Sequence, residues 1–150
     1  CLTNLLNMID YKLILSRYGI SKTAFRSELL NLFYTSKKSF SVGGVQESFS
    51  NSVNKATIYR ALEHFEKKGL IHKVPDKDGH KKYALCRHSE CNSRSHNHNH
   101  GHFICFSCNQ TICLDQKTIP QLSCLKGFYV EDITLTAEGY CKDCYKNNVR

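Results

Sequence analysis

Two cysteine pairs with the same spacing constrain this chain more than any other feature. Each pair has two residues between its cysteines, Cys105 with Cys108 and Cys141 with Cys144. Four thiolates fill the tetrahedral coordination shell of Zn²⁺ and leave no position for water, so the predicted site is structural. Two redox dithiols are the alternative, but neither pair lies in a thioredoxin-like βαβ pattern. The surrounding segment is too small to bury much core, so metal binding, worth on the order of 10 kcal/mol, would stabilise its fold.

The other cysteines and the hydropathy pattern indicate a cell compartment. The chain has 150 residues and nine cysteines, an odd number that cannot pair completely within the chain. No secretory leader is recognisable, and no apolar run approaches the ~18 residues that span a bilayer. We therefore expect reduced thiols that bind metal, a cytoplasmic location and no membrane partner.

Charge is distributed unevenly along the chain. The net charge is +8, and residues 1–90 carry 15 basic against 8 acidic groups, whereas residues 91–150 carry 6 against 5. A basic first part followed by a nearly neutral second part suggests a module that binds a polyanion joined to another unit. A basic surface without a partner is the alternative.

Hydrophobic spacing in the first part predicts helices that precede a hairpin. Apolar residues recur at helical intervals, and strand-like segments flank a Pro-Asp-Lys-Asp-Gly turn. This is the order of a winged helix-turn-helix, in which the last helix enters the DNA major groove. The helices are expected at 2–18, 23–34, 42–49 and from Ser52 or Asn54 to Gly69, and the strands at 70–74 and 81–86.

The last of these helices carries the candidate DNA contacts. Its buried stripe would be Ile58, Leu62 and Phe65, which leaves a polar face for base edges and nearby phosphates. Basic residues on other elements would contact the phosphate backbone, which adds affinity and salt dependence; solvated surface positions are the alternative. The candidates are Thr57, Tyr59, Arg60 and Lys55 on the helix, Lys22 and Arg26 before it, and Lys81 and Lys82 on the hairpin.

A second group of metal-binding residues surrounds a His- and Asn-rich linker. We divide the chain into a winged-helix domain at 1–86, a linker at 87–99 and a zinc-stabilised α+β dimerisation domain at 100–150. The last domain should contain strands at 103–106, 111–114 and 129–136 and a helix at 119–126. Candidate ligands near the junction are Cys86, His100, His102, His72 and Cys113.

One motif suggests an enzyme and is rejected. His88-x-Glu90 followed by the first cysteine pair is similar to the zinc deaminase signature. Ile104 stands where that signature has proline. The second cysteine pair would also close the coordination position that a catalytic water needs. We therefore predict no catalytic residues and no enzymatic activity.

Taken together, the motifs resemble the ferric uptake regulator (Fur) family. The stretch from Ala56 to Leu62 resembles its recognition helix, and the stretch from His100 to Cys108 resembles its sensor strand and first cysteine pair. The second pair, Cys141 and Cys144, is similar to the pair that closes the site. The resemblance implies a homodimer that represses metal-uptake genes at a palindromic DNA operator when its sensor site is filled.

Departures from the family pattern bear on the metal. Iron-responsive members have carboxylates in the sensor, where this chain has Ala84 and Cys113, and Ser39 stands near the expected sensor histidine. Gly101 and Asn99 replace residues of an additional site, which the resemblance therefore does not imply.

The chain is most similar to the zinc-responsive (Zur) branch. Tyr83-x-x-Cys86 is similar to that branch's pattern, and His72 lies at another of its ligand positions. We hypothesise a sensor of Cys86, His100 and His102, with His72 or Cys113 as the fourth ligand. Thiolate and imidazole donors favour Zn²⁺ over Fe²⁺ or Mn²⁺. The alternatives are an iron- or manganese-responsive regulator and a peroxide sensor of the same fold.

Overall fold

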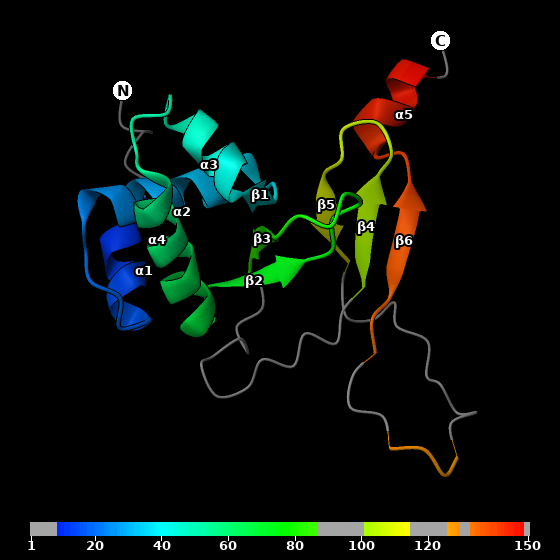
Figure 1. The fold of residues 1–150 in the computed structure, drawn as a ribbon, viewed down its shortest axis with the longest axis horizontal. Helices are drawn as coiled ribbons and strands as arrows, with labels where there is room; N and C mark the ends of the chain where they lie inside the picture. Colours follow the sequence, from blue (N-terminus) through cyan, green and yellow to red (C-terminus); the bar gives the residue numbers. More distant parts are fainter. Residues whose placement is uncertain (1–8, 87–100, 115–125, 130–132, 149–150) are drawn as a thin grey trace, which may run out of the picture.

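A computed structural model describes residues 9–86, 101–114, 126–129 and 133–148. Four helices and a small sheet form the N-terminal part, and a second sheet and a helix form the C-terminal part (Figure 1). This is the predicted α+β fold with an N-terminal winged helix-turn-helix. The helices are α1 (Tyr11–Arg17), α2 (Ala24–Ser36), α3 (Val42–Ser48), α4 (Lys55–Lys67) and α5 (Lys142–Asn148); the strands are β1 (Phe40–Ser41), β2 (Ile71–Val74), β3 (Lys82–Leu85), β4 (His102–Cys105), β5 (Thr111–Cys113) and β6 (Thr136–Gly139).

The first helix begins later than predicted. Its start at Leu2 lies outside the described residues, and Ile9 and Asp10 are not helical. The Asp10 carboxylate accepts hydrogen bonds from the backbone N–H groups of Lys12 (3.0 Å) and Leu13 (3.2 Å), so it caps a helix that begins at Tyr11. A side-chain cap satisfies the first free N–H groups of a helix and defines its start.

Helix α4 confirms the helix predicted from Ser52 or Asn54 to Gly69. Of the two proposed caps, Asn54 is the one used, and its side-chain oxygen accepts a hydrogen bond of 2.7 Å from the N–H of Ala56. Ile58, Leu62 and Phe65 are fully buried in the core of the N-terminal part. Gly69 has a φ of +78° and follows the helix end, a conformation that glycine adopts without steric cost.

The N-terminal sheet contains one strand that was not predicted. The helix predicted at 23–34 extends further, because α2 continues to Ser36 and Lys37 ends it with a φ of +54°. Phe40 and Ser41 then pair antiparallel with Tyr83 and Lys82, so the sheet order is β1-β3-β2. A strand of two residues is too short for its hydrophobic alternation to be recognised.

The C-terminal sheet has the order β5-β4-β6. Strand β4 pairs antiparallel with β5 and parallel with β6, close to the predicted strands at 103–106 and 111–114. The strand predicted at 129–136 is wrong among the described residues, because β6 begins at Thr136, opposite His102. The predicted helix at 119–126 lies outside the described residues except for Lys126, which is in a turn, and α5 was not predicted.

Candidate metal centres and nucleic-acid interface

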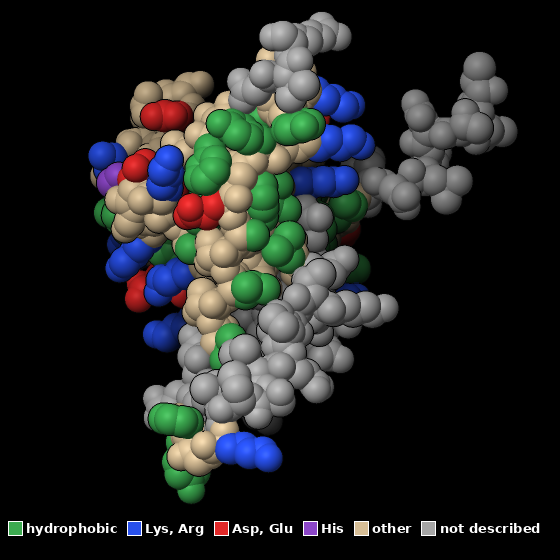
Figure 2. All heavy atoms as spheres, turned by 90° about the vertical axis from the view of Figure 1, so that its right-hand side faces the viewer, with side chains coloured by type: hydrophobic (Ala, Val, Ile, Leu, Met, Phe, Trp, Pro, Cys, Tyr) green, Lys and Arg blue, Asp and Glu red, His purple; other side chains and the backbone are tan. Residues whose placement is uncertain are grey.

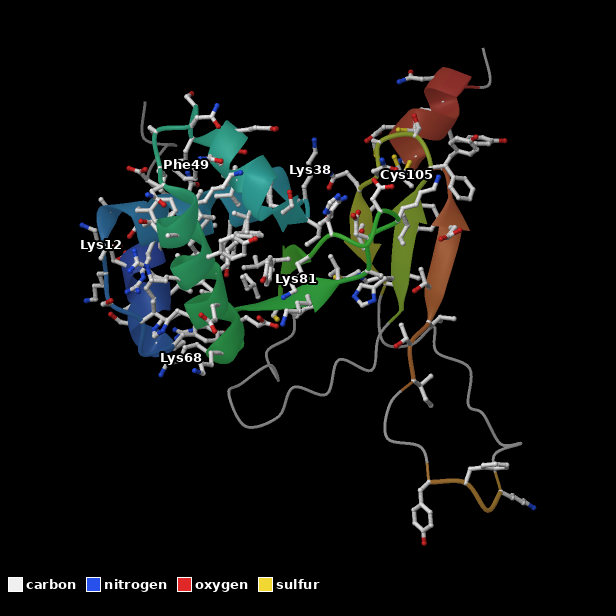
Figure 3. All side chains as sticks on the ribbon, viewed as in Figure 1. Lys12, Lys38, Phe49, Lys68, Lys81 and Cys105 are labelled. Atoms are coloured by element: carbon white, nitrogen blue, oxygen red, sulfur yellow. The ribbon has the colours of Figure 1, made fainter. Side chains whose placement is uncertain are left out.

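The four paired cysteines meet beside the second sheet. Cys105 ends β4, Cys108 lies in the turn after it, and Cys141 and Cys144 lie at the start of α5 (Figure 3). All four sulfur atoms lie within 4.8 Å of one another, and those of Cys108 and Cys141 are 3.9 Å apart. Sulfurs at about 2.3 Å from a tetrahedral zinc ion lie about 3.8 Å from each other. The cluster therefore fits the predicted four-thiolate metal site.

Backbone donors prepare this cluster to hold thiolates. The N–H of Cys141 donates to the Cys105 sulfur at 3.3 Å. Hydrogen bonds from the N–H groups of Cys108 and Cys141 lower the pKa of Cys105 to about 6. At Cys144 the Ser107 side chain acts to lower the pKa, but the Cys141, Cys108 and Cys105 side chains and burial together outweigh it and raise the pKa to about 12. Several thiols this close ionise together only when a cation compensates their charge.

A second cluster joins the two sheets. His72 from β2, His102 from β4 and Cys113 from β5 place one ligand atom each within 4.8 Å of one another. The His72 and His102 side chains are buried, and His102 faces Cys113 in the β4–β5 register. The Nε2 atom of His72 lies 3.3 Å from the Cys113 sulfur. Two imidazoles and a thiol form a donor set that fits zinc, and the described part of this cluster contains no carboxylate.

The two other predicted sensor ligands, Cys86 and His100, do not belong to this group of three. The Cys86 sulfur lies 3.3 Å from Nδ1 of His72, on the opposite side of the imidazole from Cys113. His100 lies outside the described residues, as does the predicted linker at 87–99. The structure thus brings His72, His102 and Cys113 into one group and places Cys86 against its edge.

The candidate DNA contacts on and near α4 lie at the surface. Lys55, Tyr59 and Arg60 are exposed and Thr57 is half-buried. Lys22 is exposed, and Arg26 is half-buried and donates to the Ser21 carbonyl and hydroxyl oxygens.

Basic charge also gathers at the C-terminal end of α4. Partial burial and the charges of Arg26, Lys68 and Lys67 lower the pKa of His64. Figure 3 places Lys68 and Lys12 at the far end of the helical part from the Cys105 cluster. A surface of this sign suits the phosphate backbone of a nucleic acid.

The two hairpin lysines differ from each other. Lys81 is exposed, as a phosphate contact requires. The Lys82 side chain is only 17 % exposed, and its ammonium lies 2.5 Å from the Asp76 carboxylate and 2.8 Å from the Asn109 carbonyl. The prediction that Lys82 contacts DNA has no support from this geometry, because the ammonium is held between Asp76 of the hairpin and the Asn109 carbonyl of the C-terminal part.

Sequence reasoning did not find the contacts between the hairpin and the first cysteine turn. Thr111 and Ser39 meet across 72 positions of sequence, and neither residue belongs to a recognisable motif. The pairing of Asp76 with Lys82 is local, but their spacing is equally typical of an exposed turn.

A winged helix-turn-helix joined through a His/Cys cluster to a cysteine-rich α+β unit defines a metal-responsive DNA-binding regulator. The chain belongs to the ferric uptake regulator family, whose profile matches residues 17–137. Members of this family are transcription regulators rather than enzymes, in agreement with the rejected deaminase motif. Within the described residues, no helix has the length and apolar character to cross a membrane.

Individual relatives agree with this assignment. The ferric uptake regulation protein of Synechococcus elongatus is 27 % identical over 106 residues, which cover 68 % of this chain and 67 % of that protein. A zinc uptake regulator solved with zinc and DNA has a TM-score of 0.63 at 21 % identity and covers 93 % of both chains. The Francisella tularensis ferric uptake regulator solved with iron has a TM-score of 0.55 at 27 % identity, covering 85 % of this chain and 96 % of its own.

Proposed function

We propose that this chain represses metal-uptake genes in response to zinc, as a homodimer on a palindromic operator. The domain boundaries at 86 and 100 belong to the same proposal. The observation that carries it is the cluster of His72, His102 and Cys113, which draws its donors from both parts of the molecule. Similar folds occur in zinc, iron and manganese regulators, so the fold does not select the metal.

The donor set supports zinc. Thiolate and imidazole ligands bind Zn²⁺ well, whereas Fe²⁺ and Mn²⁺ favour sites richer in carboxylate oxygen. Ala84 and Cys113 stand where the resemblance leads us to expect acids, and the described cluster has none. Its remaining donor would be Cys86 or His100, both of which the sequence predicts as sensor ligands. An iron or manganese regulator is the second candidate, supported by the relatives solved with those metals. A peroxide sensor would need iron-catalysed oxidation at the same ligands.

The position of the cluster links metal to DNA. When bound, a metal ion supplies bonds that hold several donors together at one point. His72 lies in the hairpin that follows α4, while His102 and Cys113 lie in the C-terminal sheet. A restraint between them limits how the α4 surface with Tyr59 and Arg60 is oriented relative to that sheet. If the orientation that metal favours is also the one that binds the operator, metal binding and operator binding are cooperative.

The C-terminal part supports a homodimer. Hydrophobic side chains gather on the face that Figure 2 turns toward the viewer. Six large hydrophobic residues described in this part are at least 42 % exposed: Phe106, Ile112, Phe128, Tyr129, Tyr140 and Tyr145. An exposed apolar area of this kind is typical of a protein interface. Two copies related by twofold symmetry would present their α4 helices to two half-sites of a palindrome.

Replacement of one sensor donor tests the proposal. Cys113→Ser should retain one zinc ion per chain, held by the four paired cysteines, and should lose zinc-triggered DNA binding. Glu138→Gln alters an exposed polar residue of β6 in the same sheet and should respond to zinc like the wild type. Fluorescence anisotropy with promoter DNA measures both. A Cys113→Ser variant that still responds to zinc like the wild type would remove the cluster from the sensor.

A further inference from the structure

A polar seam joins the hairpin to the first cysteine turn, apart from both metal clusters. At its centre, the Lys82 ammonium pairs with Asp76, whose side chain is 2 % exposed, and donates to the Asn109 carbonyl. Asp76 and Lys82 both belong to the hairpin, whereas Asn109 ends the turn that begins at Cys105. The ion pair therefore directs one partly buried ammonium toward the C-terminal part.

Thr111 extends the same seam. Its hydroxyl donates to the Pro75 carbonyl at 2.8 Å, and its backbone N–H donates to the Ser39 hydroxyl at 3.3 Å. Thr111 and Ser39 are each 3 % exposed. Near them the Lys77 ammonium lies 5.2 Å from the centre of the Phe106 ring, within the range of a cation–π contact. The C-terminal part thus contacts both the hairpin turn and Ser39, the residue before β1.

The acceptor of Lys82 is fixed by the cysteine turn. The N–H of Asn109 donates to the Cys105 carbonyl at 3.0 Å, and Asn109 has a φ of +52°. The N–H of Cys105 donates in turn to the Gln110 carbonyl at 3.0 Å. These bonds close the turn and hold the Asn109 carbonyl toward Lys82, so the seam depends on the segment that the four-cysteine site organises.

The seam is in register with the second metal cluster. Lys82 pairs with Val74 in the hairpin, and His72 lies two residues before Val74 on the same strand. On the other side, Thr111 and Cys113 are two residues apart on β5. The polar seam and the His72, His102 and Cys113 cluster are therefore neighbouring contacts between the β2–β3 hairpin and strands β4 and β5. Alternate residues of a strand share one face, so a rigid seam brings His72 and Cys113 to the same side of the junction.

We propose that Lys82, Asp76, Thr111 and Ser39 form an interdomain latch that keeps the hairpin docked when the sensor holds no metal. This inference rests on the proposed function for the role of His72 and Cys113. The latch brings the sensor donors together before metal arrives, so metal binding does not bear the full cost of docking the domains. The apparent affinity of a site is its intrinsic affinity multiplied by the fraction of molecules that are competent to bind. Lys82 and Thr111 are then positioning residues that raise sensor affinity without contacting the metal.

Amide hydrogen exchange tests the latch directly. The protein would carry zinc in the four-cysteine site only, and exchange would be followed in the segments 71–74, 82–85 and 109–113. Lys82→Met and Thr111→Val each remove one side-chain contact across the junction. Lys73→Met is the matched control, because it breaks the Lys73–Glu66 pair, which lies within the N-terminal part. We expect exchange in 109–113 to become about 10-fold faster in both latch variants and to stay unchanged in the control.

A zinc competition titration gives the second readout. The latch variants should bind sensor zinc about 10-fold more weakly than the wild type, while the control binds it equally well. The inference requires both results. It is overturned if exchange in 109–113 is the same in all four proteins, or if exchange rises while sensor affinity does not change.

The two proposals fail differently. A wild-type protein that binds no second zinc ion would overturn the zinc sensor and the effect of the latch on zinc affinity. The exchange comparison, made without sensor zinc, would still decide whether these residues hold the hairpin docked. Because Lys82→Met leaves Asp76 without its partner, the Thr111→Val variant separates a lost latch from a damaged hairpin. If only Lys82→Met accelerates exchange, the effect belongs to the hairpin and the latch is overturned.

Discussion

The Nε2 atom of His72 lies 3.3 Å from the Cys113 sulfur, although the two residues are 41 positions apart. His72 belongs to the hairpin of the winged-helix part and Cys113 to the C-terminal sheet. This contact makes the junction between the two parts a candidate sensor. Substitutions of the residues around His72 can therefore show which of them bind the sensor metal.

The two thiols near His72 should differ in their contribution to metal binding. Cys113→Ser removes a donor of the three-residue cluster and should abolish the second zinc equivalent. Cys86 contacts the other ring nitrogen, so Cys86→Ser should weaken sensor zinc by at least the ~10-fold typical of a lost group that orients a ligand. Competition titration against a zinc chelator measures both. Wild-type affinity in Cys86→Ser would show that Cys86 neither binds the metal nor orients His72.

Removal of the four-cysteine metal should unfold the C-terminal part. Few of the described residues in this part are buried. Among them, Ile104 and Cys105 are the only hydrophobic residues with buried side chains. Zinc binding worth on the order of 10 kcal/mol would therefore be the largest stabilising contribution there. A strong chelator should abolish amide protection in β4 and β6 and leave α4 protected. Persistent protection of β4 in metal-free protein would contradict a structural role for the site.

Residues of α4 should contribute differently to DNA binding. Lys55→Ala removes an exposed charge and should weaken binding to specific and unrelated DNA alike, with a smaller dependence on salt. Arg60→Ala should cost about 1–3 kcal/mol on the operator and less on unrelated DNA, as a base contact does. Anisotropy at several salt concentrations distinguishes the two. An equal loss on both DNAs for Arg60→Ala would assign that residue to the phosphate backbone.

The latch should weaken in acid. Burial acts to raise the pKa of Asp76, but the hydrogen bond and charge of Lys82 and the N–H groups of His80 and Asp78 lower it overall. A lowered folded-state pKa contributes stability above the unfolded value of about 3.9, and this stability is lost as the pH falls through the folded value. The free energy of unfolding of the wild type should exceed that of Asp76→Asn near pH 6, and the difference should shrink below about pH 4. A difference that is independent of pH would show that the charge of Asp76 does not stabilise the protein.

Local signals in the sequence predicted the helix and the cysteine pairs on which the family assignment rests. Helix α4 has a capping residue, a regular apolar stripe and a terminal glycine, and the cysteine pairs have a spacing that only a few structures use. Strand β1 and the start of β6 were missed because each is defined by its partner strand rather than by its own residues. The contact of Ser39 with Thr111 was missed for the same reason. The inward direction of Lys82 depends on the Asn109 carbonyl, which no local pattern places beside it.

The most direct test of the zinc sensor is DNA affinity at controlled free metal concentration. The full chain, loaded with its structural zinc, would be titrated onto promoter DNA from its own gene neighbourhood under anaerobic conditions. Zinc would be buffered across the picomolar range, and Fe²⁺ and Mn²⁺ would be titrated in parallel. We predict that trace zinc alone induces tight binding and that Cys113→Ser removes this response. Tight binding that requires Fe²⁺ or Mn²⁺ and ignores zinc would contradict the proposed metal.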